Sequence, residues 1–191
     1  MNASTSFRSR SPLPSADPRS SSQSPFWRFS LRFYRQPGVA DACITLQEQS
    51  GIDVNLLMFL FWHATHSHAL STAEVKELER RIAPWREMTV VPLRRTRRAL
   101  KSPGHLVAPA AAEVFRTKVK ALELEAERLQ QEAMYAPVRT SLLGRKVANA
   151  QEAAQANIVT YAASCGRASF SRQATQTLLA AFGSLKRNPE E

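Results

Sequence analysis

The stretch from Ser50 to His68, SGIDVNLLMFLFWHATHSH, decides the fold because it contains the longest apolar run of the chain. Every side chain from Leu56 to Trp62 is apolar, so at about 100° per residue apolar groups surround almost the whole circumference of a helix. A helix of that kind lies at the centre of a core. Asp53 is placed to cap its start, and Asn55 and His63 interrupt an apolar run that is already too short for a membrane span. The sequence therefore predicts a central core helix.

Helical signals continue on both sides of this stretch. The start and stop signals are Ser24–Pro25, Pro37, Gly51 and a capping box at Ser71–Glu74. Beyond the capping box we expect a helix to about Arg81, a restart at Pro84 and a kink at Pro92. No segment shows convincing strand alternation with turns between. The predicted fold class is therefore an all-α bundle of five to seven helices with a disordered N-terminal tail.

A long helix is predicted from about Ala110 to Tyr135. Its apolar residues alternate steps of four and three, the pattern of a coiled-coil seam. They are Phe115, Val119, Leu122, Ala126, Leu129 and Ala133. Such a seam needs a partner face, which is either the rest of its own bundle or a second copy of the chain. The sequence leaves both open, so a homodimer through the long helix is one expectation.

The composition divides the chain into three parts. Residues 1–24 contain nine serines and three prolines without apolar periodicity, which predicts a disordered tail; a targeting segment is the alternative. Residues 25–136 are expected to form the helical core domain, ending in the long helix. Pro137 ends that helix, and residues 137–191 are expected to form a helical extension.

Half of the net charge of +10 lies in residues 71–105, which carry nine Lys and Arg against four acids. On a helical projection of PLRRTRRALK, four cations fall within an arc of about 100°. They are Arg94, Arg97, Arg98 and Lys101. This stripe is either solvated and paired with glutamates of the long helix, or it binds an acidic or phosphate-bearing partner. An acidic protein or RNA is the expected partner class, although no RNA- or DNA-binding signature is present.

Asn55, His63 and His66 lie on one side of the core helix and form the second candidate site, a polar pocket. His63 and His66 are neighbours on one helix face, but no HExxH or carboxylate spacing completes a zinc site. Asp53 already has a sufficient role as the helix cap. We therefore predict no metal ligand, no catalytic residue and no cofactor.

Several motifs occur in a characteristic order. They are Trp27 and Tyr34, PGV at Pro37–Val39, Cys43 ahead of DVNLL, PWR at Pro84–Arg86, and PLRRTRR. Over about residues 26–134 this order resembles a small bacterial family of uncharacterised proteins of unknown function. The resemblance implies a cytoplasmic helical protein and assigns no catalytic residue.

Two function hypotheses follow from these patterns. The first is a non-enzymatic interaction protein that presents the basic helix to an acidic or phosphate-bearing partner. The second is a small enzyme or a ligand- or metal-binding protein with a polar pocket around Asn55, His63 and His66. The first is preferred, because no nucleophile–base pair, phosphate loop or dinucleotide fingerprint is present.

Overall fold

The computed structural model describes residues 23–102, 104 and 106–187. Nearly all of the predicted tail therefore lies outside the described residues. The helices are α1 (Pro25–Tyr34), α2 (Val39–Ser50), α3 (Val54–Thr65), α4 (Thr72–Trp85), α5 (Val91–Ala99), α6 (Pro109–Tyr135), α7 (Ala150–Ser164) and α8 (Arg172–Arg187). A π-helical turn, η1 (Arg86–Val90), joins α4 to α5, and a 3₁₀ turn, η2 (Ala136–Val138), follows α6. The predicted all-α fold class is confirmed.

The helix caps are formed by the residues that the sequence marks. Ser24 Oγ accepts a hydrogen bond from Trp27 N at 3.0 Å, and Asp53 Oδ1 accepts one from Leu56 N at 3.1 Å. Ser71 and Glu74 form the reciprocal capping box. Each of these bonds satisfies a backbone N–H in the first turn of a helix, where no intrahelical acceptor exists.

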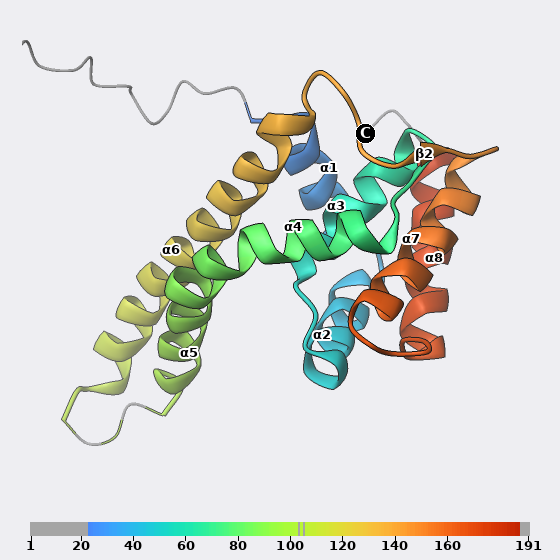
Figure 1. Cartoon of the computed structure of the whole chain (residues 1–191). Coiled ribbons are helices and arrows are strands. Elements are labelled where there is room, and N and C mark those ends of the chain that lie inside the picture. The colour runs from blue at the N-terminus through green and yellow to red at the C-terminus, as the bar shows by residue number, and fades with distance from the viewer. Residues whose placement is uncertain (1–22, 103, 105, 188–191) are drawn as a thin grey trace, which may run out of the picture.

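Helix α3 lies at the centre of the molecule, as its apolar circumference predicts (Figure 1). Helices α1, α6 and α7 all contact it, and one continuous cluster of buried apolar side chains joins it to α2, α4 and α8. Ala153 and Ala154 of α7 are fully buried, which lets that helix approach α3 closely. Helices α7 and α8, from the predicted extension, thus contribute to the same cluster as α1–α4.

Asn157 of α7 ties this packing together through its side-chain amide. Its Nδ2 donates to Leu60 O at 2.9 Å and to His68 O at 3.0 Å, while its Oδ1 accepts from Leu70 N at 2.8 Å. The residues after α3 form β1 (His68–Ala69), which pairs antiparallel with β2 (Arg145–Lys146). A buried amide with all these partners stabilises the structure, whereas an unsatisfied one would cost free energy.

Helices α4, η1 and α5 form one bent helical path. Pro84 does not interrupt α4, and the chain turns in η1, where Val91 N donates to Arg86 O across five residues. A π turn is wider than an α turn and is a common cause of a helix bend. The bend thus precedes Pro92, which lies in the first turn of α5.

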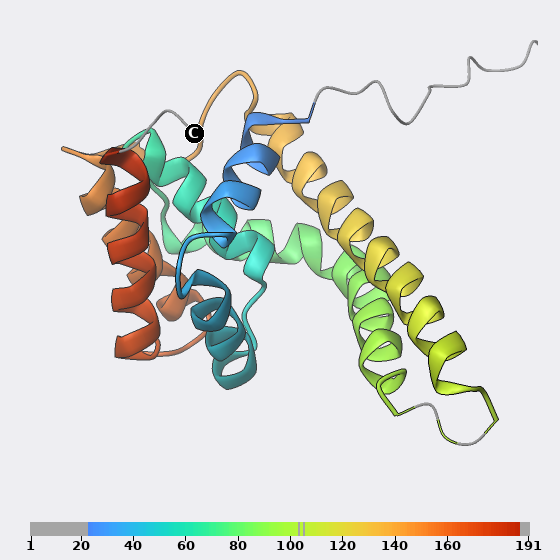
Figure 2. The ribbon, with the colours of Figure 1, turned by 180° about the vertical axis from the view of Figure 1, so that it is seen from behind.

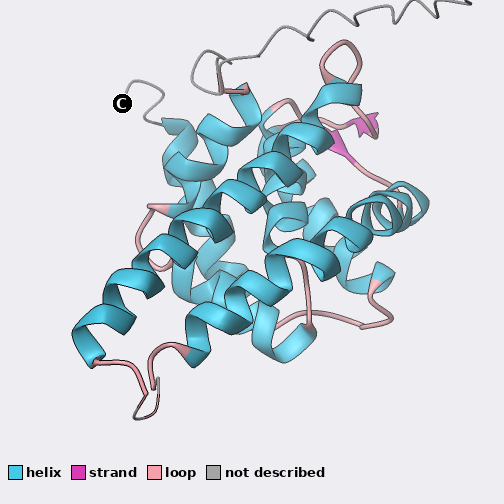
Figure 3. Cartoon of the chain, turned by 90° about the vertical axis from the view of Figure 1, so that its left-hand side faces the viewer, coloured by secondary structure: helices cyan, strands magenta, loops and turns pink. Residues whose placement is uncertain are grey.

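Residues 86–129, which we call the arm, project from the remainder, which we call the body (Figures 1 and 2). In the arm, α5 runs beside the first part of α6, and a loop joins them at the tip (Figure 3). The predicted seam of α6 is divided: Val119 and Ala126 are buried, whereas Phe115, Leu122 and Leu129 are exposed. Within the described residues, α5 has no buried side chain that could pack on the exposed half of this seam.

Candidate functional site

A groove of about 780 Å³ lies where the arm meets the body. Helices α1 and α2 and the start of α3 line one side of it, and α5 and the middle of α6 line the other. The groove brings together residues from both sites that the sequence suggests. They are Arg94, Arg97, Arg98 and Lys101 of the basic stripe, and Asn55 of the polar pocket.

Two of the four predicted cations are engaged inside the protein. Arg94 Nε donates to Glu123 Oε1 at 3.0 Å, and Arg94 Nη2 donates to Glu127 Oε1 at 2.7 Å. Arg97 holds both oxygens of Glu123 through Nε and Nη2. These two arginines therefore fasten α5 to α6, the internal pairing that the sequence left open as one alternative.

The two glutamates differ in how well they are compensated. Burial alone would raise the pKa of Glu123, but the hydrogen bonds and charges of Arg97 and Arg94 outweigh it and lower that pKa. Burial raises the pKa of Glu127, because Arg94 alone only partly offsets the loss of water. Glu123 is thus the firmly ionised centre of this cluster.

Four other cations of the groove remain exposed. Arg98, Lys101, Lys120 and Arg35 line it, and none of them has an ion pair within the described part of the chain. They surround apolar side chains that are also exposed in the groove, namely Tyr34, Ile44 and Leu124. The site therefore offers apolar contact area with a positive rim, which suits an amphipathic anion.

Asn55 is buried at the edge of this groove and has a structural partner. Gln131 Nε2 of α6 donates to Asn55 Oδ1 at 2.8 Å, which ties the start of α3 to the part of α6 that directly follows the arm. An amide pair of this kind fixes the position of two helices relative to each other.

Beside it lies a buried charged cluster that sequence reasoning missed. Asp53 Oδ2 accepts from Gln130 Nε2 at 2.9 Å and from Arg86 Nη1 at 3.3 Å. Arg86 also pairs with Glu79 at 2.7 Å, and these opposite charges raise its pKa even though burial alone would lower it. The sequence feature that could have indicated this cluster is the PWR motif, which contains Arg86, considered together with the capping residue Asp53. This cluster anchors the π turn, and with it the arm, to the start of α3.

The two histidines of the predicted polar pocket lie away from the groove. Asn55 and His66 are eleven residues apart in and just after α3, or about 16 Å along the helix axis. His63 is fully buried; its Nδ1 lies 3.1 Å from Phe59 O, and its Nε2 accepts from Leu143 N at 3.3 Å. Burial lowers the pKa of His63 to about 4. The fold does not bring Asn55 into one site with the histidines.

Within the described residues, no group of three or more His, Cys, Asp or Glu side chains is arranged to hold a metal ion. In the same part of the chain, no helix is both long and apolar enough to cross a membrane. Cys43 is buried, and burial raises its thiol pKa to about 12. Such a thiol stays protonated at neutral pH.

Comparison with known proteins gives one match. No curated protein and no solved structure is similar to the chain. A family model matches residues 25–134, close to the span of about 26–134 over which the sequence motifs resemble a family, and so confirms that resemblance. The matched span runs from α1 to the end of α6 and contains the whole groove. The chain therefore belongs to the family described as protein of unknown function (DUF2390).

Proposed function

We propose that this protein is a non-enzymatic interaction protein of the cytoplasm, which binds an acidic amphipathic helix of a partner protein in the groove. The observation that carries the proposal is the combination of exposed apolar groups with unpaired cations in one groove. Arg98, Lys101 and Lys120 are exposed there beside Leu124 and Ile44. Leaving these groups together in water gains nothing for the fold, whereas a ligand with matching chemistry can use both.

An amphipathic helix fits this chemistry better than a small anion does. Helix-in-groove recognition places apolar side chains at every third or fourth position against an apolar floor, while polar residues meet the rim. Tyr34 and Ile44 come from α1 and α2, and Leu124 comes from α6, so the apolar groups line opposite walls. Carboxylates at the edge of the bound helix would then reach Arg98 and Lys101.

RNA is the less favoured partner. Glu48, Glu123 and Glu127 also line the groove, and a continuous phosphate backbone would pass close to them. No aromatic side chain of α5 alternates with its arginines to form a stacking platform. A helix can place its few carboxylates only where the cations lie, so the mixed charge of the groove favours it.

The alternative function, a small enzyme or ligand-binding protein, would use Asn55, His63 and His66 together. His63 and His66 do not line the groove that contains Asn55, and His63 and Asn55 already bond to protein partners. No observation therefore favours that alternative over the groove.

The test uses the full chain and a synthetic helix of about 18 residues, five turns, with leucines on one face and glutamates on the other. Fluorescence anisotropy should show binding at about 50 mM salt that weakens at about 500 mM. A matching helix with lysines in place of the glutamates should not bind. The double variant Arg98→Glu/Lys101→Glu should bind the acidic helix at least about tenfold more weakly.

A matched control reverses two exposed cations outside the groove, Lys76→Glu and Arg95→Glu, with the same change in net charge. This control should bind as the wild type does. An equal loss in both double variants would mean that only overall charge matters. Tighter binding of single-stranded RNA than of the acidic helix would make nucleic acid the partner and overturn the proposal.

A further inference from the structure

The face of α6 that points away from the groove carries a second exposed apolar surface. Phe115, Leu122 and Leu129 are 54%, 58% and 43% exposed. Residues seven apart drift by only about 20° around a helix, so the three side chains form one stripe. Leu124, which lines the groove, projects from α6 about 160° away from Leu122. The stripe is thus separate from the groove and does not rest on the function proposed for it.

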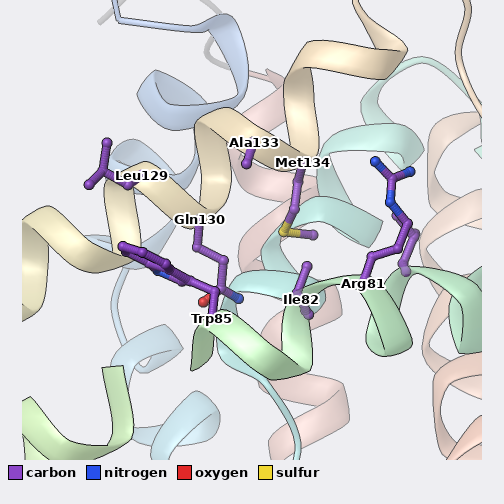
Figure 4. Close-up of a pocket in the computed structure, with 8 residues that line it drawn as sticks. Arg81, Ile82, Trp85, Leu129, Gln130, Ala133 and Met134 are labelled. Atoms are coloured by element: carbon purple, nitrogen blue, oxygen red, sulfur yellow. The ribbon is translucent and has the colours of Figure 1, made fainter. Parts of the chain in front are cut away.

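The stripe ends at a pocket of about 400 Å³ between α4 and α6. Leu129 belongs to both the stripe and the pocket. Figure 4 shows Trp85 and Ile82 rising from α4 and Leu129 and Met134 coming from α6 around this space. Its volume and mostly apolar lining suit an aromatic ring.

Charged residues beside the stripe are distributed unevenly along α6. Lys118 lies four residues before Leu122, whereas Glu125 and Glu132 follow it at three and ten residues. All three lie on the same flank of the stripe. Around the helix axis, each is about 60° or less from a neighbouring stripe residue, which is Leu122 for Lys118 and Glu125, and Leu129 for Glu132. Glu125 bonds to Arg128 at 2.7 Å, and Lys118 has no ion pair within the described residues. An identical helix running in the opposite direction would set Lys118 beside Glu125 of the other copy.

We propose that two copies of this chain pair along their stripes, antiparallel about a two-fold axis at Leu122, with Phe115 of each copy filling the α4–α6 pocket of the other. Phe115 and Leu129 are each seven residues from Leu122, about 10 Å along the helix. A two-fold axis at Leu122 therefore brings Phe115 of one copy level with Leu129, and hence with the pocket, of the other. The interface is isologous and closes after two copies.

The spacing, the position of the pocket and the charges all favour a second copy over another partner. A heptad stripe is the pattern of a helix that packs on another helix, and this one is self-complementary in both apolar and charged residues. The side chain that fills the α4–α6 pocket, Phe115, then comes from the same stripe of the second copy. The arm projects from the body (Figures 1 and 2), and the exposure of Phe115, Leu122 and Leu129 leaves this face of α6 open to a second copy.

The first experiment is sedimentation of the full chain over a range of concentrations. The wild type should be a dimer, and Leu122→Glu should raise the dimer dissociation constant by more than about a hundredfold, because two carboxylates then face each other at the axis. The control Val159→Glu makes the same change at a residue of α7 that is 64% exposed, and it should remain dimeric. A wild type that is monomeric throughout, or a Leu122→Glu dimer as tight as the wild type, would overturn the proposal.

The second experiment tests the register and does not depend on Leu122→Glu folding. In a Cys165→Ser background, which removes the exposed native thiol, Leu122→Cys should form an intermolecular disulfide on mild oxidation. Val114→Cys, exposed on the same helix but off the stripe, should cross-link at least about tenfold more slowly. Equal rates would refute the register.

The third experiment exchanges charges across the interface. Lys118→Glu should weaken the dimer, and Lys118→Glu combined with Glu125→Lys should restore it. Leu122→Glu should still bind the acidic model helix, so a failure of the dimer and a failure of the groove proposal give different results.

Discussion

The body and the arm of this protein are stabilised in different ways. Helix α3 of the body is buried on nearly all sides by apolar neighbours, whereas α5 of the arm has no buried residue and is held mainly by Arg94, Arg97 and Glu123. Twelve large apolar side chains are exposed among the described residues, and nine of them belong to residues 86–129. Most apolar side chains of the body are thus buried in its core, whereas many apolar side chains of the arm are exposed to water. A segment of that kind is suited to presenting surfaces to partners.

The largest expected difference between the two regions comes from removing a phenyl ring from each. Phe182 of α8 is fully buried, with ring centroids 6.1 Å from Phe33 and 5.3 Å from Phe61. Phe182→Ala should lower the free energy of unfolding by about 3–5 kcal/mol, the cost of a core cavity. Phe115→Ala in the arm should cost less than about 1 kcal/mol.

Urea unfolding measures both changes, in the Leu122→Glu background so that pairing of copies does not contribute. Equal losses from the two substitutions would contradict the division into body and arm. A small loss for Phe182→Ala would show that α8 does not share the core with α1 and α3.

The next largest effect is a pH dependence that belongs to the body. His63 has a pKa of about 4 in the folded protein against an ordinary value of 6.5. Between these two pH values the unfolded chain binds a proton that the folded chain does not, so stability falls as the pH drops from 6.5 towards 4. The loss is about 3 kcal/mol over the whole window.

His63→Gln keeps a hydrogen-bonding side chain and removes the titration. Unfolding by urea at pH 7 and at pH 4.5 should therefore show a smaller difference for the variant than for the wild type. The lowered pKa of Glu123 acts in a different window, because the stability it gives the arm is lost only as the pH falls below about 4.5. An unchanged pH dependence in His63→Gln would assign the effect to other groups.

An intermediate effect is expected where the two regions join. Asp53→Ala removes a helix cap and leaves Arg86 and Gln130 without that acceptor, which should cost about 2–3 kcal/mol. Asp53→Asn should cost less, because Asn caps helices as well as Asp does and only the charge is lost. Urea unfolding of the two variants separates the cap from the ion pair. Equal costs would show that the cap contributes little and that loss of the buried charge accounts for the whole effect.

Among the buried polar groups, the smallest effect is expected in the arm itself. Glu123→Gln weakens the bonds to Arg94 and Arg97, whose side chains are partly exposed, so it should cost about 1–2 kcal/mol. Hydrogen exchange should speed up in α5 and the facing part of α6 and stay unchanged in α3 and α7. The exposed pair Glu113–Arg116 provides the control, because Glu113→Gln should leave exchange unchanged. Faster exchange throughout the body would mean that the arm is part of the cooperative core.

The basic stripe shows where sequence reasoning reached its limit. All four cations of the predicted stripe line the groove, but the helical projection could not tell which of them pair inside the protein. Arg94 and Arg97 meet Glu123 because the chain turns at η1 and α6 then runs back beside α5, and a helical projection of one segment contains neither event. Charge reversal at Arg94 or Arg97 would therefore disturb the arm as well as the groove, and Arg98 and Lys101 are the informative positions.

Periodicity alone was likewise insufficient for the long helix and for the histidines. The heptad pattern of α6 identified Leu122 and Val119 as equivalent, although Leu122 is exposed and Val119 is buried. A helical projection placed Asn55 and His66 on one face, but it contains no axial distance, and the helix separates the two by about three turns.

The sequence by itself determined the local structure: the helices, their caps at Ser24, Asp53 and Ser71, and the central position of α3. These depend on neighbouring residues and on apolar periodicity, which are written along the chain. Only the tertiary structure decided which charges are neutralised and which stay exposed. That outcome depends on distances of a few ångströms between residues such as Arg94 and Glu123 or Arg86 and Asp53, which lie about thirty positions apart in the sequence. The groove and its unpaired cations exist because the fold brings five helices to one place.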